Sequence, residues 1–462
     1  MTNFKDKKIH FIGIGGVGVN ALAKYALGCG AKVSGSDAKF SELCEEISAL
    51  GARVYAGMNP NRVEDADIVV YSSAIKEDNV ELMRARELKI QILERQEFLR
   101  DVASTFKNIV GIAGTHGKTT TTAMLAHILK NAQKKFVGMI GGNSVDYGNF
   151  VNNSCGENDI FIVEACEYKR NFLTLHPTVA VVTNVECDHP DCYQDFASVK
   201  QAFDEYLYSA PSRIFLKNAD GGCWEIEALC DGKTQIFCAE MKNGECVLSC
   251  EGKFFGAIKL KDGGVYNFKN ATFAIISANM LGVNIEDGIS ALATFKGVNR
   301  RFEHTGDIDG VPVYFDFAHH PTEIGCVLRH ASETHCVLRH ATACNRAIDC
   351  ASGNGKIFAI FQPHTYSRTK AYFANFVDVF GTDKNIGTLI FMPTYAAREK
   401  FDKDFEVDAL AKAVADKYGR HVVIANDDEV LKLVPKYAKS HDIVLFIGAG
   451  DIYDLKDKLK YD

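Results

Sequence analysis

Residues 108–132, NIVGIAGTHGKTTTTAMLAHILKNA, decide the fold of this chain. They predict a buried strand, a glycine-containing turn and a helix in direct succession. The turn GTHGKTTT, at 114–121, lies between strand and helix, where a loop that binds phosphate must lie. Its glycines let backbone N–H groups point at phosphate oxygens, and the helix N-terminus adds partial positive charge. The stretch therefore predicts a phosphate loop in a parallel α/β sheet.

The side chains of this turn fit the same interpretation. Lys118 can reach the β- and γ-phosphates of a nucleotide, and the hydroxyl of Thr119 can hold Mg²⁺. The spacing departs from the usual G-x4-G-K-[ST] pattern, because Ile112 occupies the position of the first glycine. A threonine-rich helix cap is the alternative, but the lysine in register between strand and helix favours a phosphate loop. The other positions predicted to bind the nucleotide are Gly114, Thr115, Gly117 and Thr120.

Two continuous apolar runs follow, DIFIVEA at 159–165 and TVAVVTNV at 178–185, and both predict buried parallel strands. Glu164 ends the first run and Glu167 follows it, whereas Asp188 and His189 follow the second. Ligands bind at the carboxyl ends of such strands, and Mg²⁺ prefers oxygen ligands together with phosphate. Alone, Asp188 would be a turn residue and His189 a capped histidine. Together they predict an active site beside the phosphate loop.

The N-terminal stretch at 8–37, KIHFIGIGGVGVNALAKYALGCGAKVSGSD, predicts a strand, a helix over 17–27 and a second strand. Its GIGGVG at 13–18 has the G-x-G-x-x-G spacing, with Asp37 about twenty residues on. Alone this pattern indicates an NAD- or flavin-binding oxidoreductase. A helix N-terminus binds any diphosphate, however, and the second phosphate loop argues against the oxidoreductase.

The rest of the chain extends the α/β pattern. Residues 212–268 contain short strands and glycine turns (GKFFGAIKL, GGVYNF), which predict an antiparallel part, and FKNATFAIISANMLGV at 268–283 predicts a helix. VPVYFDFA, KIFAIFQP, GTLIFMPTY, RHVVIA and DIVLFIGAG predict further strands. We expect three domains. These are a Rossmann-like domain at 1–105, an ATPase-like domain at 106–303 with a mostly parallel sheet and a small antiparallel part, and a Rossmann-like domain at 304–462.

Composition narrows the functional classes. The chain has 462 residues and a net charge of -7, so no global positive field attracts nucleic acid. Its 15 cysteines include no C-x-x-C, which fits a reducing cytoplasm. There is no signal peptide pattern and no apolar run long enough for a membrane span. Cys246 and Cys250, spaced C-x3-C without nearby histidines, are a weak candidate for a structural metal site.

A tandem repeat interrupts the C-terminal region. CVLRHASETH at 326–335 is followed at once by CVLRHATACN at 336–345. One interpretation is a duplication that lengthens a helix or a surface loop. The other is a metal-binding or regulatory insert, which is disfavoured because His330 and His340, ten residues apart, lie on different faces of a helix.

Six motifs in order indicate a known family. They are GTHGKTTTT (114–122), VEACEYKRNFL (163–173), TNVECDHPDCY (183–193), GVNRRFEHTG (297–306), FDFAHHPTEI (315–324) and QPHTYSRTKAYF (362–373). Together they resemble the Mur ligases, over nearly the whole chain. The resemblance is strongest to members that join L-alanine to UDP-N-acetylmuramic acid in peptidoglycan synthesis, with ATP, Mg²⁺ and an acyl phosphate. Two alternatives stay open, a recycling ligase that adds a preformed tripeptide to the same sugar and a relative that has lost catalysis.

The resemblance also implies residue roles. Lys118 would hold the ATP phosphates, Thr119 and Glu164 a first Mg²⁺, and His189 a second. Asn299 and Arg300 would contact the adenine side of ATP and Asp316 its ribose. His319, His364 and Arg368 would line the alanine and phosphate side, with Arg368 and Arg301 as candidates to stabilise transition-state charge. Residues implied to bind the UDP-sugar are Gly13, Gly15, Gly16, Gly18, Asp37, Ser72 and His116.

The chain departs from the family pattern in three places. Phe317 stands where many members have tyrosine, so one hydroxyl near the amino acid is absent. MPTYAARE at 392–399 replaces a more usual pattern that has Asp before Tyr and Gly-Glu after it. The repeat lengthens the connection between HHP and QPH. The specificity for L-alanine is the part of the prediction most exposed to these changes.

Overall fold

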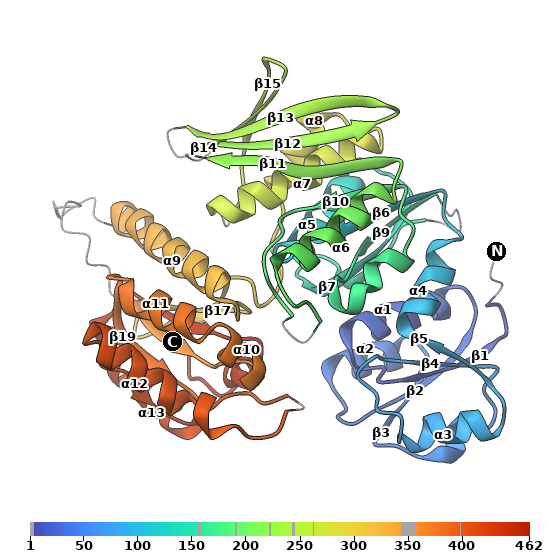
Figure 1. Ribbon diagram of the computed structural model, residues 1–462, viewed down its shortest axis with the longest axis horizontal. Helices are drawn as coiled ribbons and strands as arrows, with labels where there is room; N and C mark the ends of the chain where they lie inside the picture. Colours follow the sequence, from blue (N-terminus) through green and yellow to red (C-terminus); the bar gives the residue numbers. More distant parts are fainter. Residues whose placement is uncertain are drawn as a thin grey trace. The chain divides into compact units, whose positions relative to one another are not determined.

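The computed structural model describes residues 4–342 and 357–462, apart from 155–158, 190, 191, 221, 222, 243, 244, 262 and 398. The chain forms two compact units, Met1–Asp188 with Asp195–Val298, and His189–Gln194 with Asn299–Asp462. Three sheets of five, ten and six strands build these units (Figure 1). The predicted three-domain α/β class is therefore confirmed.

The first sheet is wholly parallel, in the order β3-β2-β1-β4-β5. Its predicted βαβ unit is confirmed as β1 (Lys8–Ile12), α1 (Val17–Gly28) and β2 (Lys32–Asp37). The central strand β1 is buried from Ile9 onward because helices cover both faces of a doubly wound sheet. The other elements are α2 (Glu42–Ala49), β3 (Arg53–Ala56), β4 (Ile68–Tyr71), α3 (Val80–Glu87), β5 (Gln91–Glu94) and α4 (Arg95–Ala103).

The ten-stranded sheet has the order β15-β14-β13-β12-β11-β10-β6-β9-β7-β8. Strands β11, β10, β6, β9 and β7 are parallel, and antiparallel strands extend the sheet at both ends. The antiparallel part is thus larger than the sequence indicated. The strands are β6 (Asn108–Ala113), β7 (Phe136–Ser144), β8 (Gly148–Asn152), β9 (Ile160–Glu164), β10 (Val179–Val182), β11 (Ser212–Asp220), β12 (Cys223–Cys230), β13 (Lys233–Lys242), β14 (Glu245–Cys250) and β15 (Lys253–Ile258).

The helices of this sheet hold the phosphate loop in place. Helix α5 (Lys118–Asn131) packs against α7 (Val265–Met280), β7 and α8 (Ile285–Leu292), and α6 (Phe196–Tyr208) packs near β10. Every residue of α5 from Thr120 to Leu129 is buried. The helix therefore shows no amphipathic stripe, and its N-terminus is fixed by packing. GGVYNF does not form a strand, because α7 already begins at Val265.

The third sheet has the order β16-β17-β21-β18-β19-β20 and is parallel except for the β16–β17 pair. Its strands are β16 (Glu303–Ile308), β17 (Val311–Asp316), β18 (Ile357–Phe361), β19 (Ile386–Phe391), β20 (Val423–Ile424) and β21 (Ile443–Ile447). Its helices are α9 (Pro321–Thr342), α10 (Tyr366–Ala371), α11 (Phe373–Thr382), α12 (Val407–Tyr418) and α13 (Asp427–Tyr437).

The tandem repeat lies largely in α9, which contains residues 326–342 in one helix. The His330 ring packs against Phe302 with ring centroids 4.4 Å apart, and burial lowers the pKa of His330 to about 4. His330 is thus a packed side chain rather than an exposed ligand, which favours the lengthened-helix interpretation. The side chain of His340 lies outside the described residues.

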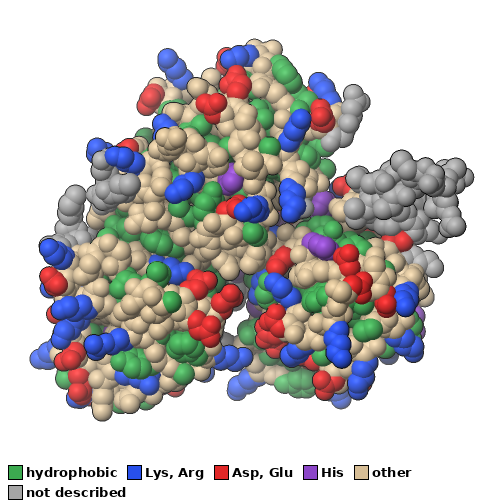
Figure 2. All heavy atoms as spheres, turned by 180° about the vertical axis from the view of Figure 1, so that it is seen from behind, with side chains coloured by type: hydrophobic (Ala, Val, Ile, Leu, Met, Phe, Trp, Pro, Cys, Tyr) green, Lys and Arg blue, Asp and Glu red, His purple; other side chains and the backbone are tan. Residues whose placement is uncertain are grey.

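Among the described residues, no helix combines the length and apolar character needed to cross a membrane. On the face drawn in Figure 2, basic and acidic side chains are interspersed rather than gathered into single-sign patches. This surface fits the modest net charge and offers no extended basic track.

Candidate active site

The phosphate loop between β6 and α5 requires its two glycines. Gly114 has φ +141° and Gly117, the N-cap of α5, has φ +83°, which glycine adopts more readily than other residues. Side chains also leave no room at these positions. A Cβ at Gly114 would lie 2.1 Å from the Thr183 hydroxyl, and one at Gly117 would lie 2.3 Å from the Asn270 side-chain oxygen.

Residues just after β10 hold the phosphate loop in place through hydrogen bonds. The sequence analysis did not assign a role to them. The backbone N–H of His116 donates to the Asn184 side chain at 2.9 Å. The Thr183 hydroxyl and the Asn184 amide both donate to the His116 carbonyl, at 2.7 and 2.8 Å. The Thr115 hydroxyl accepts the Glu186 N–H at 2.9 Å. Their signal in the sequence is the polar segment TNVE immediately after a buried strand.

Lys118 contacts two carbonyl groups of the phosphate loop and one carboxylate. Its ammonium donates to the Glu167 carboxylate at 2.9 Å and to the carbonyls of Gly114 and Thr115. Burial favours the neutral amine, but the nearby negative charge of Glu167 keeps the pKa of Lys118 above its usual value. The lysine is therefore a charged donor already poised at the loop, and the buried Glu167 acts as its counter-ion.

Glu164 and Thr119 lie against the same pair of glycines in β7. A Cβ at Gly141 would lie 2.3 Å from a Glu164 carboxylate oxygen, and one at Gly142 would lie 2.8 Å from the Thr119 methyl group. The Gly141 N–H also donates to Glu164. Paired glycines thus let a carboxylate and a hydroxyl-bearing residue approach the strand beside the phosphate loop. This set of oxygen donors suits Mg²⁺.

In the first sheet, the structure brings together several residues predicted to bind the UDP-sugar. The N–H of Gly15 donates to the Asp37 carboxylate at 2.9 Å, and Gly16 is the N-cap of α1. A Cβ at Gly13, where φ is +84°, would lie 3.3 Å from Ser72. The glycine loop therefore lies between the ends of β2 and β4, where doubly wound sheets bind ligands.

Arg95, the first residue of α4, was missed by sequence reasoning. A Cβ at Gly18 would lie 3.2 Å from its guanidinium, so Arg95 lies against the start of α1. Burial lowers the pKa of Arg95, although Cys166, Glu94 and Glu164 attract its charge. Among the described residues, no carboxylate lies within ion-pair distance of it. No pattern marked Arg95, because its proximity to the loop comes from the order β1-β4-β5 in the sheet.

In the second unit, Arg300 and Asp316 lie close together. Arg300 donates to the carbonyls of Gly448 and Gly450, and its own carbonyl accepts the Phe317 N–H at 2.7 Å. Asp316 accepts the N–H groups of Phe302 and Ala318 at 2.8 and 2.7 Å. Burial raises the pKa of Asp316 to about 6. Asn299 precedes Arg300 and is the first residue of the segment Asn299–Asp462 that forms most of the second unit.

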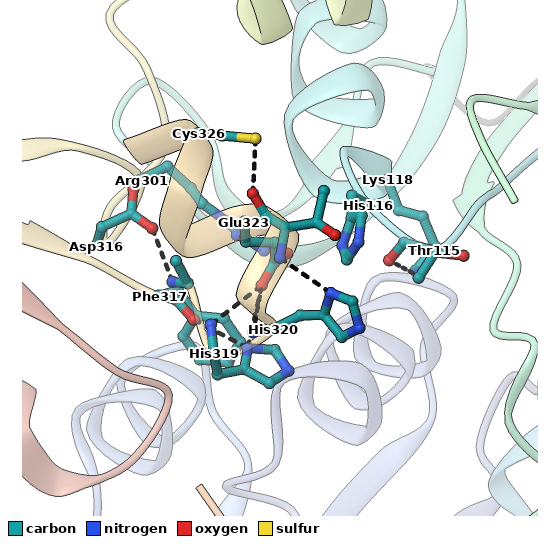
Figure 3. A network of polar contacts seen from close by, with 12 residues as sticks. Thr115, His116, Lys118, Arg301, Asp316, Phe317, His319, His320, Glu323 and Cys326 are labelled. Atoms are coloured by element: carbon teal, nitrogen blue, oxygen red, sulfur yellow. Dashed lines mark hydrogen bonds and ion pairs between the residues drawn. The ribbon is translucent and has the colours of Figure 1, made fainter. Parts of the chain in front are cut away.

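Phe317, one of the departures from the family pattern, supports both arginines with its ring. The guanidinium of Arg300 lies 4.7 Å and that of Arg301 5.1 Å from the ring centroid. Arg301 also lies 3.8 Å from Glu323, whose other oxygen accepts the N–H groups of His319 and His320 (Figure 3). The ring of Phe317 thus holds cationic side chains without a hydroxyl group.

His319, His364 and Arg368 converge in the second unit. The two imidazole centroids are 5.7 Å apart, and the Arg368 guanidinium lies 3.3 Å from His364 Nδ1. Burial lowers the pKa of His319 to about 3 and that of His364 to about 4, so both rings are neutral at physiological pH. Tyr395, from the unusual MPTYAARE stretch, stacks on His364. Neutral rings beside a buried arginine suit recognition of an anion and an amine.

His189 belongs to the short segment His189–Gln194 that groups with the second unit. Its carbonyl accepts the N–H groups of Cys192 and Tyr193, and its φ is +56°. Lys118, Thr119 and Glu164 lie in the first unit. A metal role for His189 therefore stays a prediction.

Three half-buried histidines predict that acid weakens the second unit. His319, His330 and His364 stay neutral in the folded state, whereas the unfolded chain binds protons below about pH 6.5. Above that pH, these histidines do not change the free energy of unfolding. As the pH drops toward 4, the free energy of unfolding falls by at most about 1.4 kcal/mol per pH unit for each histidine. His330→Leu should flatten this fall.

Urea denaturation at pH 7 and pH 5 measures the effect, with far-UV circular dichroism for the whole chain. The only tryptophan, Trp224, is buried in the first unit, so its fluorescence reports that unit separately. His421→Leu is the matched control, because His421 is exposed. An identical pH dependence in wild type and His330→Leu would contradict the prediction.

These features define a class. A phosphate loop with its lysine, a neighbouring strand that ends in a carboxylate, and a second glycine loop in another parallel sheet define a nucleotide-binding α/β protein with a phosphate loop. Three family models match the chain in series. They are the Mur ligase family, catalytic domain, over residues 8–107, the Mur ligase middle domain over 112–278, and the Mur ligase, glutamate ligase domain over 300–450. The chain belongs to the Mur ligase family.

Individual relatives agree with this assignment. The chain is 36% identical over 466 residues to a UDP-N-acetylmuramate–L-alanine ligase of Clostridium novyi, covering 97% of this chain and 96% of the relative. It is 33% identical to the ligase of the same name from Clostridium perfringens, with 97% and 96% covered. The crystal structure of UDP-N-acetylmuramate-alanine ligase from Thermotoga maritima matches with a TM-score of 0.72 and 25% identity, covering 98% of this chain and 97% of that one.

Proposed function

We propose that this chain is an ATP-dependent ligase that joins L-alanine to the carboxylate of UDP-N-acetylmuramic acid in peptidoglycan precursor synthesis. The observation that carries the proposal is the full-length similarity to ligases of that name, at 36% identity for the Clostridium novyi protein. The residues of both units supply the chemistry that such a ligase needs. Membership of the Mur ligase family removes the oxidoreductase alternative.

The first step needs a phosphate donor held beside a carboxylate. A carboxylate oxygen attacks the γ-phosphorus of ATP, ADP leaves, and an acyl phosphate forms. The N-terminus of α5 and the ammonium of Lys118 stabilise the charge on the transferring phosphoryl group. Lys118 must then exchange its contacts with loop carbonyls for phosphate oxygens, while Glu167 keeps it charged.

Thr119 and Glu164 are the residues that would hold Mg²⁺, since both lie at the Gly141–Gly142 pair beside the phosphate loop. A bound Mg²⁺ would neutralise phosphate charge there. Glu164 keeps its place without the ion, because it accepts the Gly141 N–H.

The second step is attack of the amine of alanine on the acyl phosphate, with loss of phosphate through a tetrahedral intermediate. We assign this side to His319, His364 and Arg368. Arg368 offers charge to a carboxylate or phosphate, and a neutral imidazole can accept a hydrogen bond from an amine.

We assign the adenosine part of ATP to Asn299, Arg300 and Asp316. We place the reaction in the cytoplasm, where ATP is available.

We assign the diphosphate of the UDP-sugar to the 13–18 glycine loop and to Arg95. A partly buried guanidinium beside a helix N-terminus, with no carboxylate partner among the described residues, is well suited to an anion. Asp37 and Ser72 lie at the ends of the strands that flank this loop. His116, whose backbone is fixed by Asn184, is assigned to the muramoyl end.

Arg95→Ala should weaken binding of UDP-N-acetylmuramic acid about tenfold, because a charge-assisted contact to diphosphate is lost. Isothermal titration calorimetry without ATP measures this directly. Arg100→Ala is the matched control, since Arg100 lies on the same helix, α4, and pairs with Asp101 at the surface. Equal affinities of the two variants would show that Arg95 does not contact the sugar nucleotide.

A phosphate-release assay tests the proposed function as a whole. The protein receives ATP, Mg²⁺ and UDP-N-acetylmuramic acid together with L-alanine, L-serine, glycine or the tripeptide. We expect release with L-alanine to exceed release with each of the others. A preference for the tripeptide would instead assign a recycling ligase, and no release with any acceptor would indicate a relative that has lost catalysis.

A further inference from the structure

Two cysteines far from the phosphate loop lie in direct contact on the antiparallel part of the central sheet. Cys223 is the first residue of β12, and Cys238 lies on β13. Their sulfur atoms are 2.9 Å apart, which is closer than two unbonded thiols usually approach. Because Cys223 pairs with Glu240 and Glu225 pairs with Cys238, the two cysteines are diagonal neighbours on one face.

This face is reachable from solvent. In β12 and β13, Trp224, Ile226, Phe237 and Ala239 point into the apolar core, so Cys223 and Cys238 point the other way and are partly exposed. The cysteines of the C-x3-C motif, Cys246 and Cys250, behave differently. Both are buried on the core side, among apolar side chains, which does not suit a metal site.

We propose that Cys223 and Cys238 are a site of reversible thiol oxidation, at which a small-molecule disulfide such as oxidised glutathione converts them to an intramolecular disulfide. Cys238 loses its proton to water and attacks one sulfur of the small disulfide, so that a mixed disulfide forms and one thiol leaves. Cys223 then loses its proton and displaces the second thiol. The two protein thiols are oxidised, and one small disulfide is reduced to two thiols.

The order of attack follows from the surroundings. Burial, the hydrogen bond to Cys238 and the nearby carboxylates of Glu240 and Glu225 raise the pKa of Cys223 to about 12. Cys223 therefore keeps its proton to higher pH, and we take the Cys238 sulfur as the attacking atom. The bond closes the open end of the β12–β13 hairpin and encloses a loop with a sequence separation of 15.

Mass spectrometry of the full-length protein tests this inference. After exposure to oxidised glutathione and alkylation of the remaining thiols, peptides containing Cys223 and Cys238 should be cross-linked and lighter by a pair of hydrogen atoms. Dithiothreitol should reverse the change. Cys223→Ser should prevent the cross-link, whereas Cys230→Ser, on the same strand, should leave it intact.

Oxidation should also raise the melting midpoint of wild type, but not of Cys223→Ser, by about 5 °C. Ligase activity should persist after this oxidation. Oxidation of Cys166, which lies near Lys118, would instead be expected to lower activity, so the two events can be told apart. Two outcomes would overturn the inference. One is a stable glutathione adduct on Cys238 while Cys223 remains alkylatable, and the other is a cross-link of Cys238 to a different cysteine.

Discussion

Lys118→Ala should reduce ligation by about 1000-fold or more, measured as phosphate release with ATP, UDP-N-acetylmuramic acid and L-alanine. The substitution removes the charged donor nearest the transferring phosphoryl group, and no backbone N–H can replace its charge. Binding of UDP-N-acetylmuramic acid, measured by calorimetry, should survive, because its proposed site is the glycine loop of the first sheet. Undiminished phosphate release, or loss of sugar-nucleotide binding together with activity, would contradict these assignments.

Two further variants make this experiment decisive. Lys130→Ala lies on the same helix, α5, but its ammonium contacts the Asn153 side chain at the surface, so activity should remain. Lys118→Ala also leaves the buried Glu167 without its counter-ion, which could destabilise the fold. The double variant Lys118→Met/Glu167→Gln removes both charges and should be folded and inactive. Activity in this double variant would exclude a role for the lysine charge.

Glu164→Gln should lower activity by about 100-fold and raise the Mg²⁺ concentration needed for half-maximal rate. The amide keeps the shape of the side chain and can still accept the Gly141 N–H, so the change removes charge while preserving the local fold. Steady-state rates over a Mg²⁺ titration give both quantities.

Glu227→Gln is the matched control, because Glu227 lies on β12 of the same sheet, outside the phosphate loop. Its Mg²⁺ dependence should equal that of wild type. If Glu164→Gln lowered the rate without changing the Mg²⁺ dependence, Glu164 would have to act on substrate charge directly rather than as a metal ligand.

Much of the fold was predictable because its determinants are local in sequence. The buried run at 109–113, the glycine turn and the helix after Lys118 are consecutive, and each is specified by neighbours a few residues away. The first βαβ unit and the strands of the third sheet other than β16 were predictable for the same reason. The antiparallel share of the central sheet was underestimated, because pairing direction depends on partners distant in the chain.

The candidate site likewise contains features that are local in sequence and features that depend on distant residues. The sequence by itself determined the phosphate loop, the glycine loop and the carboxylate at the end of β9, since a strand end carries its next residues to the sheet edge. It did not indicate that Phe317 would pack under two arginines, or that MPTYAARE would supply the ring stacked on His364.

Only the tertiary structure decided the pairings between distant residues. Glu167 became the counter-ion of Lys118, Arg95 came to lie beside Gly18, and Cys223 met Cys238 across a hairpin. These contacts join side chains from different elements, so they depend on strand order, register and burial. Periodicity and spacing specify which elements form, whereas the charge or thiol that each side chain meets follows from how the elements pack.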